Sequence, residues 1–232
     1  MARVFLVEQA FPLLNCVPYN EPADGAPASK DAAHIGYAST NASSAVRFRM
    51  VARSRHNGDV MPLSHFSEDP TIKRFVPRPP LAHPEAEPLV WAIDEWHAPI
   101  YSVPRDCPRV TFWPLPTTTP EDYERYFAAV PGRIVIAIES GWLERLRTTR
   151  LYRYRMPEET FEDIHDHGVH VSREPVVPLS VGPMGDLLAA LANADVELRI
   201  TPSLVPLGRA IIQTTLHFSL IRMRNARGWT NG

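Results

Sequence analysis

The sequence predicts an α+β domain in which a compact mixed sheet is flanked by helices. Hydrophobic residues make up 44% of the 232 positions, which is enough for a proper core. Segments with the two-residue period of strands and segments with the 3.6-residue period of helices follow one another without a strict β-α-β alternation. That mixture favours α+β over a doubly wound parallel sheet.

The chain divides into two parts of different composition. Residues 20–60 are dominated by small, polar and turn-forming side chains and keep neither period. We therefore expect residues 1–60 to form a poorly ordered extension, in which residues 2–7 have the composition of a stray strand. Residues 61–228 are expected to form a single domain.

The first part of this domain is predicted to consist of short strands. Residues 63–66 and 109–115 have strand composition, and the apolar run 88–93 is typical of a buried strand. Residues 94–101 fit one or two helical turns, and Pro104 ends them because proline interrupts a helix.

The clearest helix and the clearest strand follow in the middle of the chain. Thr119 is a suitable helix cap, Pro120 fits the first helical position, and acidic residues fill the first turn. Gly132 is expected to stop this helix. Residues 133–140 are β-branched and apolar enough for a central strand.

The last third mixes both kinds of element. In chain order we expect a helix at 141–149, a half-exposed strand at 151–156, a helical turn within 157–168 stopped by Gly168, two strand pieces within 169–181, a helix at 184–196 starting near Asp186, and a strand at 196–204. Residues 211–226 fit neither period cleanly, and we favour a helix followed by an extended tail.

Charge and composition limit the classes of partner. With 24 basic and 26 acidic residues the formal charge is −2, which argues against broad, nonspecific attraction to nucleic acids or membranes but leaves room for a local patch. The two cysteines, Cys16 and Cys107, do not resemble a disulfide framework. No signal peptide and no apolar run of about 18 residues is present. The expected location is the cytoplasm.

Residues 63–110 carry the densest set of chemically useful side chains. His65 precedes Ser67 on a predicted strand, and a neutral histidine beside a hydroxyl can hold a ribose or phosphate by hydrogen bonds. The alternative is a histidine that caps the following turn. Trp91 fits the core, whereas Tyr101 lies among polar and turn-forming residues and is the better candidate for stacking on a nicotinamide or a base.

The segment from Arg105 to Arg109 is the least ordinary part of this region. Two arginines on a proline-fixed turn match the oxygens of a phosphate, or else they pair with Asp106 and Asp94 and only brace the turn. Cys107 between them is either a nucleophile with a depressed pKa or a buried structural cysteine.

Two later features have weaker signals. His165, His167 and His170 suggest a metal site, but no cysteine pair or HExxH spacing accompanies them, and no metal is expected. Glu174 at a strand start is suited to stabilising positive charge at a sugar carbon. The alternative for Glu174 is a strand-end acid paired with Arg173.

Three stretches together resemble a known group of proteins. The pattern L-x-H-x-S-E-x-P, the segment VWAID and the segment PRDCPRV are similar to those of an uncharacterised family of microbial proteins with a domain of unknown function. The resemblance covers about residues 62–227. It implies membership of that family and no activity.

A looser resemblance suggests a mechanism. The order of a strand with His-x-Ser, an aromatic after the next strand and a late strand-start glutamate resembles ADP-ribosyltransferase-like domains. That resemblance implies that His65 holds a ribose of NAD and Glu174 polarises the reacting ribose. It implies that Tyr101 packs on the nicotinamide, with Trp91 or Trp96 as the alternative for this role. His65, Ser67, Arg105 and Arg109 would then anchor the dinucleotide.

These observations lead to two main hypotheses. The first is a small ADP-ribosyltransferase-like enzyme that cleaves NAD or transfers ADP-ribose, with NAD as substrate and Glu174, His65 and Tyr101 as catalytic residues. The alternative is a non-catalytic domain that binds a nucleotide or a partner through the same arginines. A metal-dependent hydrolase based on the 165–170 histidines ranks behind both.

Overall fold

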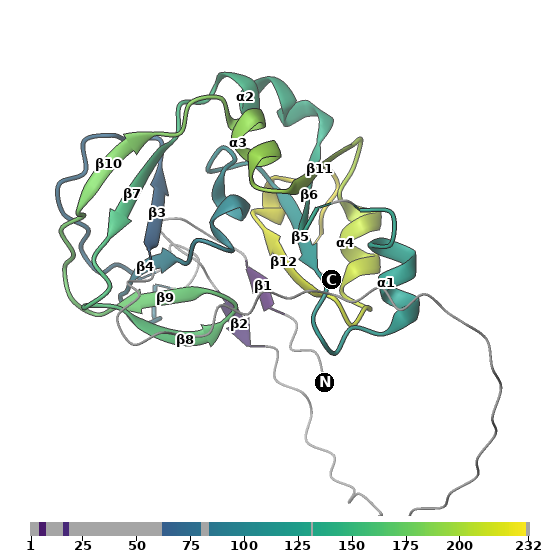
Figure 1. Ribbon diagram of the computed structural model, residues 1–232, viewed down its shortest axis with the longest axis horizontal. Coiled ribbons are helices and arrows are strands. Elements are labelled where there is room, and N and C mark those ends of the chain that lie inside the picture. Colours follow the sequence, from purple (N-terminus) through teal and green to yellow (C-terminus); the bar gives the residue numbers. More distant parts are fainter. Residues whose placement is uncertain (1–4, 8–15, 19–61, 80–83, 131, 231–232) are drawn as a thin grey trace, which may run out of the picture. The chain divides into compact units, whose positions relative to one another are not determined.

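The computed structural model describes residues 5–7, 16–18, 62–79, 84–130 and 132–230. The described residues form an α+β fold with four α-helices, a six-stranded sheet and a four-stranded sheet (Figure 1). The predicted fold class is therefore confirmed. Most of the predicted extension, residues 1–60, lies outside the described residues, apart from the antiparallel pair β1 (Phe5–Val7) and β2 (Cys16–Pro18).

The six-stranded sheet is antiparallel throughout and has the order β10-β7-β3-β4-β9-β8. The predicted strands at 63–66, 88–93 and 151–156 lie side by side at its centre. Its members are β3 (Leu63–Ser67), β4 (Val90–Ile93), β7 (Tyr152–Met156), β8 (Glu162–Asp166), β9 (Val169–Ser172) and β10 (Ser180–Pro183).

The four-stranded sheet has the order β11-β6-β5-β12. Strand β6 is fully buried, as its β-branched sequence predicts, and it runs parallel to β11 and antiparallel to β5. Strand β12 pairs antiparallel with β5. The members are β5 (Arg109–Trp113), β6 (Ile134–Glu139), β11 (Val196–Thr201) and β12 (His217–Ile221).

Local sequence signals explain where two of the helices begin. Helix α1 (Pro120–Tyr126) starts after Thr119, whose side chain accepts a hydrogen bond from the Asp122 N–H, as the capping pattern predicts. Helix α3 (Leu187–Asn193) starts after Asp186, whose carboxylate accepts from two backbone N–H groups. The other helices are α2 (Leu143–Thr148), α4 (Val205–Ile211) and the short 3₁₀ helices η1 (Ala98–Tyr101), η2 (Ser140–Trp142) and η3 (Met223–Asn225).

One hydrophobic core joins the two sheets. It contains Phe66, Trp91 and Ile93 from the six-stranded sheet and Ile134, Ile136 and Ile138 from β6, together with leucines of α2 and α3. The other face of the four-stranded sheet packs against α1 and α4, and the other face of the six-stranded sheet packs against Phe75 and Val176. Each sheet is therefore covered on both faces.

Two sequence predictions for the last third are wrong. The segment 157–168 contains strand β8 and a turn rather than a helical turn, because His165, His167 and Gly168 all take positive φ and reverse the chain into β9. The segment 211–226 contains the end of α4 and then strand β12, in which Phe218 and Leu220 point into the core, as Leu216 does just before it.

Helix α4 itself was not predicted, because Pro206 and Gly208 both argue against a helix. Pro206 lies in the first turn, where proline is tolerated. Gly208 packs under Trp229, and a Cβ there would lie 3.0 Å from the indole ring. In the described part of the chain, no helix has both the length and the apolar composition needed to cross a bilayer.

Candidate anion-binding site

The segment Pro104–Arg109 lies where three strands of the four-stranded sheet meet. Arg109 is the first residue of β5 and pairs with Ile138 in β6 and Ile221 in β12. Arg222 follows β12 directly. The two arginines therefore lie on neighbouring strands, where the start of β5 meets the end of β12. The backbone there is fixed by sheet pairing, which makes the positions of both side chains well defined.

Arg109 is a buried cation without an acidic partner. Arg109 is 3% exposed. Its Nη1 donates a 3.0 Å hydrogen bond to the Cys107 carbonyl, whereas its Nε has no hydrogen-bond partner. The guanidinium carbon lies 5.6 Å from the centre of the Tyr101 ring. Among the described residues, no carboxylate lies within ion-pair distance of it. Burial lowers the pKa of Arg109.

Arg222 is a second buried cation, at 4% exposure. It takes a left-handed conformation with φ of 55°, and its Nε donates to the Arg105 carbonyl at 3.3 Å. The nearest acid, Asp106, lies at 4.0 Å and is half exposed. Burial lowers the pKa of Arg222 to about 10. The neighbouring charges of Arg224, Arg105 and Arg109 also lower this pKa, and Asp106 raises it.

Two exposed arginines, Arg105 and Arg224, complete the cluster on the solvent side. The loop that carries Arg105 is braced through its backbone, because the Arg105 N–H donates to Glu68 and the Asp106 carbonyl accepts from Asn225. We call Arg105, Arg109, Arg222 and Arg224 the arginine cluster. Sequence analysis found the first two and missed the others, although two arginines directly after an apolar strand are a recognisable signal.

Two buried ionisable groups near the cluster, Glu139 and Cys107, form no ion pair with its arginines in the described part of the chain. Glu139 at the end of β6 is buried, and its carboxylate accepts from the backbone N–H groups of Leu204 and Arg227. Cys107 is fully buried, and burial raises the pKa of its thiol to about 12. The thiol therefore stays protonated at neutral pH, which favours the structural interpretation of Cys107 over the nucleophilic one.

Residues 64–226 match the sequence profile of DUF6886, a family of unknown function. The chain belongs to the DUF6886 family. The match covers most of the chain and includes all four residues of the arginine cluster. No curated protein and no solved structure matches the chain.

The remaining candidate residues of this DUF6886 chain do not meet in one cleft. His65 is 3% exposed, its Nδ1–H donates to the Trp91 carbonyl at 2.9 Å, and its ring packs on Phe75. Burial lowers the pKa of His65 to about 3, so the imidazole is neutral at physiological pH. Ser67, at the end of the same strand, accepts from the Asp69 N–H.

Tyr101 lies on the opposite face of β3 from His65. Consecutive strand residues point to opposite faces, and Phe66, the neighbour of His65, stacks on the Tyr101 ring at 6.4 Å. The Tyr101 residue is 6% exposed. Glu174 is exposed beyond the end of β9, where its N–H donates to the Ser172 hydroxyl. Arg173, the partner considered for Glu174, instead pairs with Glu87 and Glu162.

The histidines of 165–170 separate in space. His165 is exposed, and His170 is buried within β9. His167 lies against His217 and near His97, with ring centres 3.4 and 6.4 Å away. No group of three or more metal-ligating side chains was found in the described ranges. Of these histidines, His167 and His217 line a small cavity between the two sheets, beside Trp113 and Tyr101.

Proposed function

We propose that this DUF6886 protein binds a phosphate-bearing small molecule, with nucleotides as the first class to test, at the arginine cluster. The observation that carries the proposal is the pair of buried guanidinium groups, Arg109 and Arg222. Arg109 has no carboxylate within ion-pair distance among the described residues, and Arg222 has only a 4.0 Å contact with the half-exposed Asp106. A buried charge is strongly unfavourable unless it is paired. An anionic ligand would supply the missing charge.

The arrangement suits phosphate for two reasons. Guanidinium groups match phosphate oxygens with two parallel hydrogen bonds, and several arginines together favour a ligand with more than one negative charge. Arg105 and Arg224 are exposed, so a ligand in solvent can reach them. The positive charges of the buried Arg109 and Arg222 are screened less by solvent than surface charges are.

Calorimetric titration of ATP, NAD and inorganic pyrophosphate at low ionic strength tests this function. Arg105→Ala is the informative variant, because the loop is held through the Arg105 backbone and that contact survives the substitution. We expect saturable binding that weakens about tenfold or more in this variant, as for loss of one charge-assisted hydrogen bond. Arg209→Ala, an exposed arginine on α4, should bind normally. Equal binding by Arg105→Ala, or no heat with any of the three ligands, would contradict the proposal.

A second candidate function is cleavage of NAD or transfer of ADP-ribose. The observation that favours it is the neutral His65 imidazole, fixed by the Trp91 carbonyl, since the implied role of this residue is to hydrogen-bond a ribose rather than to carry charge. The measurement is release of nicotinamide from NAD, which should disappear in Glu174→Gln while the fold persists. A release rate equal to that of buffer would leave only the binding function.

A further inference from the structure

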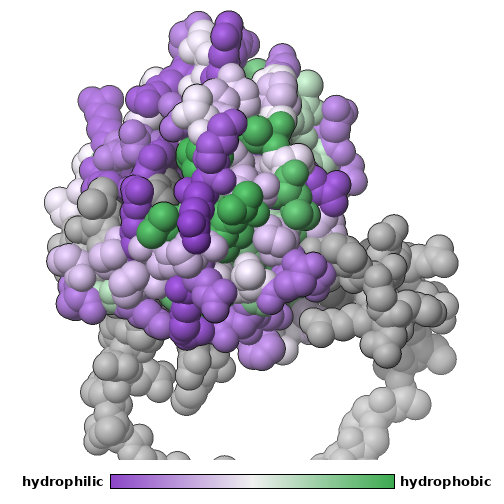
Figure 2. All heavy atoms as spheres, turned by 90° about the vertical axis from the view of Figure 1, so that its left-hand side faces the viewer, coloured by the Kyte–Doolittle hydropathy of each residue, from purple (hydrophilic) through white to green (hydrophobic). Residues whose placement is uncertain are grey.

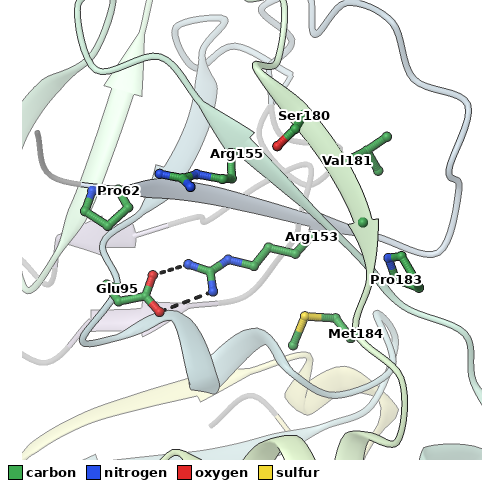
Figure 3. Close-up of a pocket in the computed structure, with 9 residues that line it drawn as sticks. Pro62, Glu95, Arg153, Arg155, Ser180, Val181, Pro183 and Met184 are labelled. Carbon is green, nitrogen blue, oxygen red and sulfur yellow. Dashed lines mark hydrogen bonds and ion pairs between the residues drawn. The ribbon is translucent and has the colours of Figure 1, made fainter.

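An open pocket of about 480 Å³ lies where the edge strand β10 pairs with β7 (Figure 3). Its lining comes from both strands, from Met184 after β10, from Pro62 before β3 and from Glu95 after β4. The volume falls within the range of small-molecule sites. None of the lining residues belongs to the arginine cluster, so the pocket is a separate candidate site.

The register of β10 with β7 decides which side chains face the pocket. Ser180 lies opposite Arg155, and paired residues of neighbouring strands share a face of the sheet. Gly182 and its partner Arg153 lie on the same face, because residues two apart in a strand point the same way. Val181 points to the other face, away from the arginines in Figure 3. The pocket side of the two strands therefore presents guanidinium groups, a hydroxyl and glycine backbone.

Arg153 and Glu95 form a fixed ion pair at one side of the pocket. Both Nη groups of Arg153 bond the Glu95 carboxylate, and its Nε donates to the Ser64 hydroxyl at 2.7 Å. Each Nη carries a second N–H and each carboxylate oxygen a second lone pair, so the pair still offers donors and acceptors side by side. The Glu95 side chain is 57% exposed, which leaves its oxygens open to a ligand. Hydroxyl groups both donate and accept, so neighbouring hydroxyls of a ligand match this pair.

Arg155 supplies the charge that a ligand has to match. Its side chain is exposed, and no carboxylate in the described ranges forms an ion pair with it. Arg153 and Glu95 neutralise each other, so the lining carries one net positive charge. A carboxylate fits the guanidinium fork with two parallel hydrogen bonds. In Figure 3 Arg155 extends toward the same side of the pocket as Arg153, so one ligand can contact both Arg155 and the ion pair.

Gly182 leaves room for a ligand between these groups. A Cβ added at Gly182 would have nothing within 4 Å, and the φ of this residue is not in the left-handed region. Neither crowding nor backbone conformation therefore requires a glycine here. Glycine weakens the interior of a strand and often marks a place where a ligand comes close. Figure 2, which views the side of the molecule where β10 and β7 lie in Figure 1, shows a largely hydrophilic surface with a few apolar areas, which suits a polar ligand.

We propose that this pocket binds a polyhydroxylated carboxylate of the sugar-acid class. The carboxylate of the ligand accepts two hydrogen bonds from Arg155. Its hydroxyl groups exchange hydrogen bonds with the Arg153–Glu95 pair and with the Ser180 hydroxyl, and its carbon chain lies over Gly182. This site is independent of the arginine cluster and of the function proposed for it.

The test uses D-gluconate as the probe, D-glucitol as its neutral analogue and acetate as the bare anion. Nuclear magnetic resonance titration of the full chain at constant ionic strength should show saturable binding of D-gluconate, with shifts in β7 and β10. Each analogue should bind at least about tenfold more weakly, because it retains only one part of the recognition. Equal affinity for either analogue, no saturation by D-gluconate at millimolar concentration, or shifts confined to the arginine cluster would overturn the proposal.

Substitutions on the two faces of β10 locate the site. Gly182→Val should abolish binding, because the added Cβ has free space around it and the branched side chain then fills the pocket. Val181→Thr, a change of nearly equal size on the opposite face, is the matched control and should bind normally. Arg155→Ala should weaken D-gluconate binding about tenfold, to the level of D-glucitol. Far-UV circular dichroism checks that all three variants keep the fold. Unaltered binding by Gly182→Val or by Arg155→Ala, or an equal loss in Val181→Thr, would also overturn the proposal.

Discussion

At the scale of single residues, the least expected feature is two buried guanidinium groups of which one, Arg109, has no carboxylate partner in the described ranges and the other, Arg222, has only a 4.0 Å contact with Asp106. Arg109 and Arg222 each use a guanidinium N–H on a backbone carbonyl and leave most of their charge unmatched. Such residues lower the stability of the folded protein, and a ligand that neutralises them restores it.

We expect Arg109→Met to raise the free energy of unfolding by about 1 kcal/mol or more, because a length-matched apolar side chain removes the buried charge. The same variant should lose affinity for phosphate ligands. Chemical denaturation gives the first quantity and calorimetry the second. Arg209→Met on the surface of α4 is the control and should change neither. A clear loss of stability in Arg109→Met would mean that the contacts with Cys107 and Tyr101 outweigh the burial of the charge.

A second prediction at this scale concerns acid stability. Burial lowers the pKa of His65 from 6.5 to about 3, so the folded state favours the neutral ring and the unfolded state takes up the proton first. Its contribution to stability is complete above pH 6.5 and declines as the pH falls toward 3, by about 2 kcal/mol at pH 5. His65→Asn, whose amide can replace the Nδ1–H donor, should flatten the dependence of stability on pH between 6.5 and 5. A curve as steep as that of the wild type would contradict this assignment.

At the scale of elements, the β8–β9 turn depends on one glycine. Gly168 has a φ of +86°, and a Cβ there would lie 2.2 Å from His97 Nδ1 and 2.5 Å from Asp94 Oδ2. Those two side chains bond each other at 2.8 Å, and the Asp94 N–H donates to the Gly168 carbonyl. The turn is therefore locked to the start of η1.

We expect Gly168→Ala to lower the free energy of unfolding by about 3 kcal/mol or more, since backbone strain and steric overlap add. Gly185→Ala is a matched control, because its φ is also positive, at +70°, while nothing lies within 4 Å of the added Cβ. That variant should lose only about 1 kcal/mol from backbone strain. Urea denaturation measures the free energy of unfolding of both variants. Equal losses would show that His97 and Asp94 move away from the added Cβ at little cost.

The same scale shows what the sequence could and could not reveal about the fold. The caps at Thr119 and Asp186 and the β-branched run of β6 are local signals, and they placed α1, α3 and β6 correctly. Strand β12 was obscured because it is short and follows a helix with an apolar end after only a five-residue turn, 212–216. Tertiary pairing with β5 decides its conformation.

At the scale of the whole molecule, the two sheets share one hydrophobic core. This arrangement decides which distant side chains can meet and whether the two sheets unfold together. Sequence order suggested a common hollow for His65, Tyr101 and Glu174, but the alternation of β3 sends its neighbouring side chains into different cores. The arginine cluster, by contrast, joins residues more than a hundred positions apart. Only the pairing of β5 with β12 brings these arginines together. Local sequence patterns therefore identified two of the four, Arg105 and Arg109.

The shared core predicts that both sheets unfold together. Trp91 belongs to the six-stranded sheet and Trp113 to the four-stranded sheet, and both lie in the same cluster. Denaturation followed by tryptophan fluorescence and by far-UV circular dichroism should therefore give coincident transitions. Separate midpoints, or an intermediate with one tryptophan exposed, would mean that the sheets are independent.

Glu139 has a practical consequence for handling the protein. Its buried carboxylate is held by N–H groups from two distant segments, one of them only a few residues from the C-terminal end. Proteolytic trimming ahead of Arg227 would remove one of the two N–H donors and leave this buried carboxylate with the Leu204 N–H alone. Affinity labels are therefore best attached beyond Gly228, and spontaneous clipping at that end should be monitored by mass spectrometry before any loss of function is assigned to a mutation.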